Sequence, residues 1–270
     1  MENKNEMISL DRTVSNLAAL GLDGAQPRVR ILWMYPDSLN IHGGRGDIMA
    51  LLRFATMAKL PVEICRVDRF ADPIPLEDAH MLYFCCGDLD CAADLCKALE
   101  PHKAALEAFA KAGKVMVANG STGVVLGKDL QYLDGSQLTC LGLLGMHAQQ
   151  RKTIHGDDLW LDAMDGVEVI GNEIKRVEIT LDPEQQPFAS VRYGRGNCGD
   201  GKEGAMAGNV IYTSCLGPML VRNPKLAMEL LARAASAAGL ALGDLPAEAL
   251  ALEEKAFEEA KVFITKKLQK

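Results

Sequence analysis

The chain has 270 residues, of which 49% are apolar and 24% are charged, with a formal net charge of −7 and a pI of about 5.3. This composition is typical of a globular α/β protein, and the acidic balance argues against a general nucleic-acid-binding surface, which needs a basic face. No apolar run approaches the roughly 20 residues of a membrane-spanning helix, so we expect no membrane span. The polar N-terminus lacks a signal-peptide core. We therefore expect a cytoplasmic protein with an N-terminal arm or short helix over 1–28 and a single domain over 29–270.

The cysteine pattern does not predict a metal site. Cys86, Cys91 and Cys96 recur every five residues, whereas zinc sites use closer C-x-x-C pairs. In a chain of this length without an export signal, reduced and buried thiols are the default. The glycines after the first strand do not form a G-x-x-x-x-G-K-[ST] phosphate loop. We expect neither a metal nor a cofactor.

Strand-like apolar runs alternate with helix-like stretches through the first half of the chain. Residues 47–59 carry apolar side chains at helical spacing, and 88–112 is rich in helix formers. The expected strands are 30–35, 62–67, 81–86 and 115–118. This alternation predicts an α/β fold with a mostly parallel sheet sandwiched by helices.

After residue 130 the apolar runs become shorter and are separated by polar or glycine-containing turns, which predicts antiparallel strands added to the sheet. These strands are expected at 159–162, 167–170, 177–180 and 188–191. A glycine-rich loop covers 194–204, and a late strand covers 209–215. An amphipathic helix is predicted for 223–238 and a second helix for 246–270.

A working site in such a fold lies at the carboxyl ends of the strands. The residues Asn119-Gly120-Ser121-Thr122-Gly123 follow the fourth strand and resemble a strand-to-helix elbow that exposes a nucleophile. Ser121 is the pattern-based candidate, but a serine needs a nearby base, and no histidine follows residue 155. His42 is the histidine that could approach from the first strand's loop. Gly87, at another strand end, could offer a backbone N–H to an oxyanion.

Several segments together resemble class I glutamine amidotransferases of the cobyric acid synthase group, most of all GatD, the glutaminase subunit of lipid II isoglutaminyl synthase. Residues 35–48, YPDSLNIHGGRGDI, follow the family pattern YPD-x-LN-x-YGD-x-GN, with Gly44 in place of its Asp and Asp47 in place of its Asn. Further matches are Phe84 to Asp88, Gly194, Lys202-Glu203-Gly204 and Gly217-Pro218. The resemblance covers about 29–265. It implies an α/β amidotransferase fold and a Mur-ligase-like ATP-dependent partner, in a heterodimer that amidates lipid II.

The same resemblance implies that the reacting residues are missing. The family elbow C-G-G-Y-Q-x-L-G aligns without a gap to Leu126-Gly127, which places its nucleophilic cysteine at Gly120. The family segment Y-x-H-G-P aligns to 214–218 and places its histidine base at Leu216. The family's substrate-binding arginine falls near Arg151. Glycine has no side chain that can attack and leucine cannot accept a proton, so we expect the glutaminase dyad to be lost.

Three hypotheses follow. In the first, the chain is a noncatalytic scaffold or regulatory subunit for the Mur-ligase-like partner. In the second, it is an active amidotransferase, in cell-wall or cobyric acid-type synthesis, that uses Ser121, Cys86 or Cys215 in a rearranged site. In the third, it is a small-molecule sensor. Val124, Val125 and Leu216 make the expected pocket more apolar than the family's, which predicts weak or absent glutamine binding.

Overall fold

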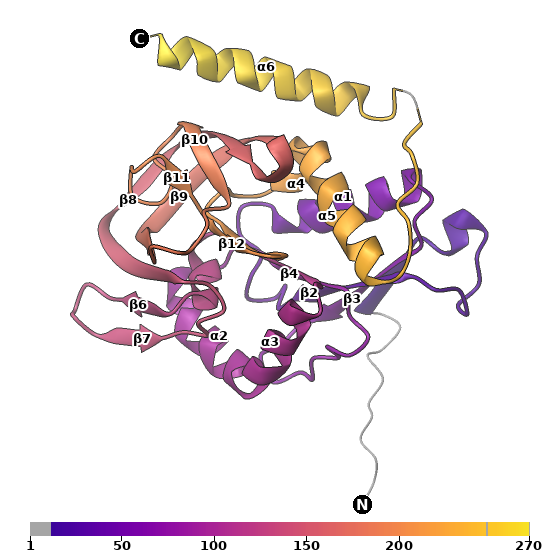
Figure 1. The fold of residues 1–270 in the computed structure, drawn as a ribbon, viewed down its shortest axis with the longest axis horizontal. Helices are drawn as coiled ribbons and strands as arrows, with labels where there is room; N and C mark the ends of the chain where they lie inside the picture. Colours follow the sequence, from indigo (N-terminus) through magenta and orange to yellow (C-terminus); the bar gives the residue numbers. More distant parts are fainter. Residues whose placement is uncertain (1–11, 247, 270) are drawn as a thin grey trace, which may run out of the picture.

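A central sheet of seven strands organises the computed structural model, which describes residues 12–246 and 248–269 (Figure 1). Its strand order is β1-β3-β2-β4-β5-β13-β12. The five inner strands run parallel and the two edge strands run antiparallel to their neighbours. The strands are β1 (Thr13–Ser15), β2 (Val29–Met34), β3 (Val62–Val67), β4 (Met81–Phe84), β5 (Val115–Asn119), β12 (Ala205–Ala207) and β13 (Val210–Thr213). The predicted α/β fold with a mostly parallel sheet is confirmed.

Helices cover both faces of this sheet (Figure 1). One face carries α1 (Gly44–Met57), α4 (Met219–Arg222) and α5 (Pro224–Ala237), which contact one another. The other carries α2 (Ala92–Leu99) and α3 (Lys103–Lys111). Strands β2, β4 and β5 are almost continuously buried because both of their faces are covered, which explains their unbroken apolar runs. Short 3-10 helices are η2 (Ala18–Leu20), η3 (Leu89–Cys91), η4 (Glu100–His102), η5 (Ser121–Leu126) and η6 (Met164–Gly166).

The added antiparallel strands of the second half are present, and β12 extends the central sheet. The strands expected between 159 and 191, however, belong to a second sheet rather than to the central one, so their predicted placement is wrong. The strand order is β11-β10-β8-β6-β7, with β9 paired to β8. The expected strands at 159–162 and 167–170 pair with each other beside the turn of one long hairpin, and the polar middle of β8 conceals the rest of it in the sequence. The strands are β6 (Asp129–Gln131), β7 (Gln137–Thr139), β8 (Met146–Ala163), β9 (Glu168–Leu181), β10 (Ala189–Tyr193) and β11 (Lys202–Glu203).

The two ends of the described chain pack on this framework. Of the segment 1–28, expected as an arm or short helix, residues 1–11 lie outside the described residues, while β1 pairs with β3 at the edge of the central sheet. The helix α6 (Ala251–Leu268) crosses the top of the second sheet, where Ile264 packs against Trp160 and Ile170 (Figure 1). None of the described helices is both long and apolar enough to cross a bilayer.

Candidate functional site

The turn after β5, called the elbow, leaves no room for a side chain at Gly120. Gly120 has φ 70° and ψ −164°, a conformation that essentially only glycine adopts. A Cβ at this position would lie 2.2 Å from Cys86 Sγ and 3.1 Å from Leu216 Cδ2. The Gly120 N–H donates to the Thr213 carbonyl oxygen at 2.9 Å, which ties the elbow to the end of β13. Glycine is therefore required here both by the backbone and by its neighbours.

The structure brings together the two positions to which the resemblance assigns the lost dyad. Leu216 follows β13 and is 2% exposed, and its Cδ2 faces the place where a side chain at Gly120 would begin. Its N–H donates to the Asn172 carbonyl oxygen in β9 at 2.9 Å, so the second sheet fixes its position. An apolar side chain thus stands at the position to which the resemblance assigns a proton-accepting group.

The thiol of Cys86 fills the space beside the elbow. It follows β4 by two residues, is 2% exposed, and lies 3.5 Å from the Gly87 carbonyl oxygen, to which it donates. Burial raises the pKa of Cys86 to about 11, although the backbone N–H groups of Ser121 and Thr122 oppose this rise. The group is therefore a neutral thiol near pH 7, and a thiol is a much weaker nucleophile than a thiolate.

The other candidates from the sequence, Ser121, Gly87 and Cys215, are buried or already hydrogen-bonded. Ser121 is 8% exposed, and within the described residues its hydroxyl makes no hydrogen bond to a histidine. The Gly87 N–H donates to Thr122 Oγ1 at 2.8 Å, so it is occupied rather than free for an oxyanion. Cys215 is fully buried, and burial raises the pKa of its thiol well above the ordinary value.

Near the elbow, at the same carboxyl edge of the central sheet, the Asp47 side chain links neighbouring elements. The sequence did not reveal this role. The Asp47 carboxylate is fully buried and accepts from the Leu220 N–H at 2.7 Å and from the Tyr83 hydroxyl at 3.0 Å. Burial raises its pKa to about 7. Gly44 fits beneath Cys85, and Gly46 fits beneath Pro218, with no space for a Cβ at either position. Asp47 therefore joins α1, β4 and α4. The sequence signal that could have pointed to this role is that Asp47 stands where the family pattern has Asn.

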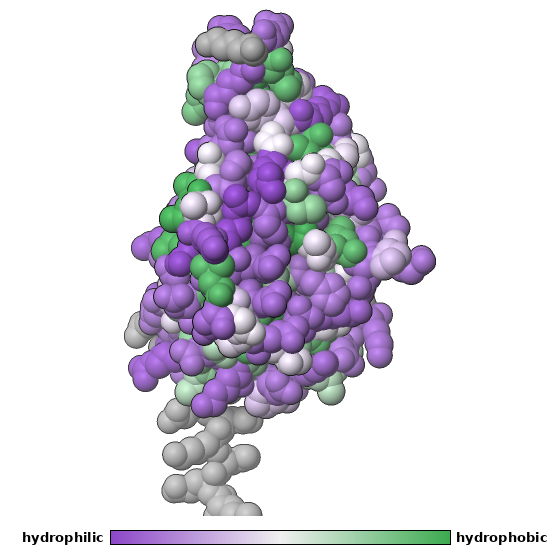
Figure 2. All heavy atoms as spheres, turned by 90° about the vertical axis from the view of Figure 1, so that its left-hand side faces the viewer, coloured by the Kyte–Doolittle hydropathy of each residue, from purple (hydrophilic) through white to green (hydrophobic). Residues whose placement is uncertain are grey.

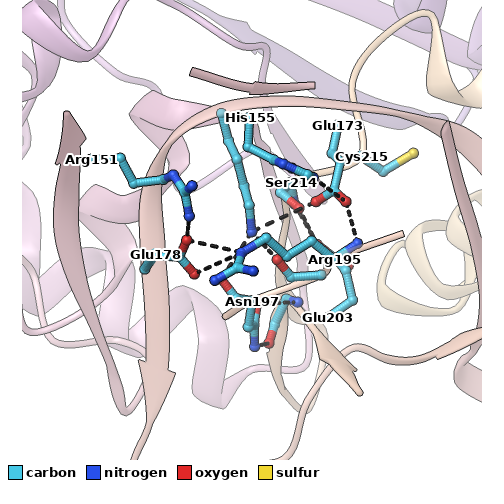
Figure 3. Close-up of polar contacts among 12 residues, drawn as sticks. Arg151, His155, Glu173, Glu178, Arg195, Asn197, Glu203, Ser214 and Cys215 are labelled. Atoms are coloured by element: carbon cyan, nitrogen blue, oxygen red, sulfur yellow. Dashed lines mark hydrogen bonds and ion pairs between the residues drawn. The ribbon is translucent and has the colours of Figure 1, made fainter. Parts of the chain in front are cut away.

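A second group that the sequence did not reveal lies between the two sheets (Figure 3). Glu203 is fully buried and accepts from the Ser214 hydroxyl at 2.7 Å and the Thr213 hydroxyl at 2.9 Å, which holds the end of β13. Burial raises the pKa of Glu203. Lys175 lies 3.6 Å from Glu173 and donates to the Asn197 carbonyl oxygen at 2.9 Å. These buried charged groups hold the glycine-rich loop over 194–204 and the end of β13 in place.

Arg151, the candidate substrate-binding residue, makes none of its described polar contacts with the elbow. It pairs with Glu178, which also accepts from Arg195 Nε at 3.0 Å (Figure 3). Between Gln150 and His155 the β8–β9 register shifts, and Arg151 sits on that irregular stretch. Its guanidinium therefore has an internal carboxylate partner.

A cavity of about 490 Å³ opens beside Leu216. Its lining comes from strands β8 and β9 of the second sheet, from loops of the central sheet and from α6. The lining residues are His42, Gly156, Asp157, Asp158, Asn172, Ile174, Leu216, Gly217 and Lys267. Lys267 of α6 ion-pairs with both aspartates across this space. No three or more His, Cys, Asp or Glu residues in the described part of the chain are placed to hold a metal ion.

No protein-family model and no curated protein sequence matches the chain. Among solved structures it is similar to a glutamine amidotransferase, at 16% identity and a TM-score of 0.48 over 77% of this chain and 99% of that one. It is also similar to a glutamine amidotransferase of Thermotoga maritima, at 12% identity and a TM-score of 0.46 over 88% and 96% of the two chains. A third is the glutaminase domain of Trypanosoma brucei CTPS with bound acivicin, at 10% identity and a TM-score of 0.45 over 81% and 96%. At these identities and scores, function is inferred from the chain's own residues.

Proposed function

We propose that the chain is a GatD-like, class I glutamine amidotransferase-type subunit that has lost its glutaminase chemistry and serves as a scaffold or regulatory subunit. The observation that carries the proposal is the elbow itself, where Gly120, the Cys86 thiol and Leu216 meet. An amidotransferase of this type needs a thiolate and a base at that point. A missing side chain, a neutral buried thiol and a leucine supply neither group.

The proposed partner is a Mur-ligase-like ATP-dependent enzyme that amidates lipid II. Support for it comes from the ordered motifs between Tyr35 and Pro218, which resemble the glutaminase subunit of that heterodimer. The buried contacts around Asp47 and Glu203 also favour a retained structural role, because they hold the strand ends in place although no chemistry depends on them. The working unit proposed for this role is a single domain from residue 29 to the C-terminus.

The cavity beside Leu216 supports a second candidate function, small-molecule sensing. Its volume of about 490 Å³ and its mixture of carboxylates with one lysine suit a small polar ligand better than an apolar one. Its charged groups already pair with each other, which is why this candidate stands second. We expect weak or absent glutamine binding, which titration calorimetry measures directly; tight binding would favour the sensor.

The decisive experiment incubates the purified chain with glutamine, alone and with the candidate ligase, and measures glutamate and ammonia. We expect no release in either case and stable co-purification of the ligase. An active rearranged site would instead give turnover that disappears in Ser121→Ala, Cys86→Ala or Cys215→Ala. The matched control is Thr153→Ala, an exposed position on β8 far from the elbow in sequence. Turnover lost in an elbow variant but kept in this control would overturn the proposal.

A further inference from the structure

The exposed side of α1 combines apolar and arginine side chains. Arg45, Met49 and Arg53 follow one another at intervals of four residues and so share one face of the helix. Met49 is 53% exposed, and the Arg53 side chain is 52% exposed. Gly46, on the same side, lies close to Val221 of α4, since a Cβ there would be 3.5 Å from Val221 Cγ2.

This face continues onto α4 and α6. Arg53 pairs with Glu253 at the start of α6, and Leu252 beside it is 76% exposed. Leu252, Val221 and Arg222 line a groove of about 370 Å³ between the two helices. We define the α1 patch as Arg45, Met49, Arg53, Val221, Arg222 and Leu252.

Two of the three arginines of the α1 patch, Arg45 and Arg222, carry positive charge that no described carboxylate neutralises, whereas Arg53 is paired with Glu253. Among the described residues, no carboxylate lies within ion-pair distance of Arg45 or Arg222. Arg45 also stands in the first turn of α1, where the helix dipole disfavours a cation. The one acidic residue of that turn, Asp47, is buried and bonded to Leu220 and Tyr83. This local positive charge stands out on a chain of net charge −7.

Other exposed apolar side chains are less suited to binding a protein. The face that contains β6–β8 is mostly hydrophilic, with apolar residues in small separate spots (Figure 2). Ile154, 64% exposed, stands on the irregular stretch of β8 among polar neighbours. Methionine and arginine are enriched in protein interfaces, where arginines often dominate the binding energy.

We propose that the α1 patch is the docking surface for the partner enzyme, and that the partner presents apolar side chains surrounded by carboxylates. This inference rests on the proposed function. Met49, Val221 and Leu252 would form the dry centre of the contact, and the arginines its charged rim. Because the chain as a whole is acidic, the arginines of the α1 patch that no described carboxylate neutralises favour an acidic partner surface at this region, which helps to set the orientation of the complex. The patch adjoins Pro218, so the docked partner would lie next to the candidate site.

The test measures the affinity of the full chain for the co-expressed Mur-ligase-like enzyme by biolayer interferometry at two salt concentrations. We expect Met49→Asp and the double variant Arg45→Glu, Arg222→Glu each to weaken binding at least tenfold, and the wild-type affinity to fall with added salt. Ile154→Asp is the matched control, at an apolar residue that is also more than half exposed but lies on another face, and it should bind as the wild type does. Thermal melting of each variant checks that it is folded.

Two results would overturn the inference, and they differ in what else they overturn. If the wild type binds the ligase but the patch variants bind equally well, the docking surface is wrong and the proposed function stands. If the wild type forms no complex with the ligase, both are wrong. As a second measurement, hydrogen exchange in the complex should show protection over 45–53 and 221–222 but not over 151–154.

Discussion

At the corner around Asp47, the buried carboxylate accepts hydrogen bonds from two other elements, whereas at the corner around Gly120 the space that a side chain there would occupy is taken by a thiol and a leucine side chain. Asp47 bonds to Tyr83 of β4 and to Leu220 of α4. The nearest atoms to a Cβ at Gly120 would belong to Cys86 and Leu216. Both corners lie at the carboxyl edge of one sheet, and both keep backbone conformations or glycines that a close approach demands. The difference is that polar cross-links join the elements at the Asp47 corner, whereas close packing alone fills the space in front of Gly120.

The largest expected effect comes from rebuilding the missing side chain. Gly120→Cys should lower the free energy of unfolding by about 4 kcal/mol, because the new Cβ overlaps Cys86 Sγ and the backbone conformation is strained for any L-residue. Urea denaturation measures the change. Gly113→Cys is the matched control: Gly113 also has a positive φ of 72°, but a Cβ there meets nothing within 4 Å, so its cost should be much smaller.

A double variant separates the overlap from the strain. Cys86→Gly combined with Gly120→Cys should recover about half of the lost stability, since the overlap disappears and the strain does not. No recovery would mean that Cys86 does not fill the nucleophile position. Adding Leu216→His to this double variant tests whether the remaining edge still supports glutamine hydrolysis.

The second largest effect concerns the other corner. Asp47→Ala should cost about 3 kcal/mol, because it leaves the Tyr83 hydroxyl and the Leu220 N–H buried without an acceptor. Chemical denaturation provides the measurement, with Asp37→Ala as control, since the Asp37 side chain is 63% exposed and should change stability by less than about 0.5 kcal/mol. Equal costs for the two variants would remove the contrast between the corners.

A smaller effect is expected where the elbow retains one polar link. Thr122→Val keeps the shape of the side chain but removes the acceptor of the Gly87 N–H, and should cost about 1–2 kcal/mol. Thr153→Val, at an exposed position of β8, should be nearly neutral. If Thr122→Val is also neutral, the Gly87 N–H is available to other acceptors and an oxyanion role for it regains support.

The α/β alternation and the elbow were predictable from the sequence for a physical reason. Strands such as β5 are buried on both faces and therefore have unbroken apolar runs in the sequence. The small residues at 119–123 indicate a tight turn. The β8–β9 hairpin was not predictable, because polar residues dominate its middle and a register shift interrupts its alternation. The cross-link of Asp47 was missed because its partners are distant in sequence: Leu220 lies 173 residues from Asp47. The partners of Glu203, Thr213 and Ser214, are only 10 and 11 residues away, but they lie at the end of a strand of the other sheet, which the sequence does not show.

The elbow's contacts illustrate the same limit. Gly120 and Leu216 were paired only through the resemblance, and nothing in composition or spacing indicates that Cys86 would occupy the space between them. Neighbours across three strand ends depend on how the sheet orders its strands. That order, with β13 beside β5, becomes visible only in the folded chain.

A further difference is expected in the pH dependence of stability at the Asp47 corner. Burial raises the pKa of Asp47 from 3.8 to about 7, so between these values the folded chain holds a proton that the unfolded chain has released. Unfolding then releases a proton, and Asp47 makes the free energy of unfolding fall as pH rises from about 4 to about 7 and level off above. In Asp47→Asn this contribution is absent, so the stability of the variant relative to wild type should rise across that window. Urea denaturation at a series of pH values measures this difference, and a flat difference would mean that the carboxyl titrates at its ordinary pKa despite its burial.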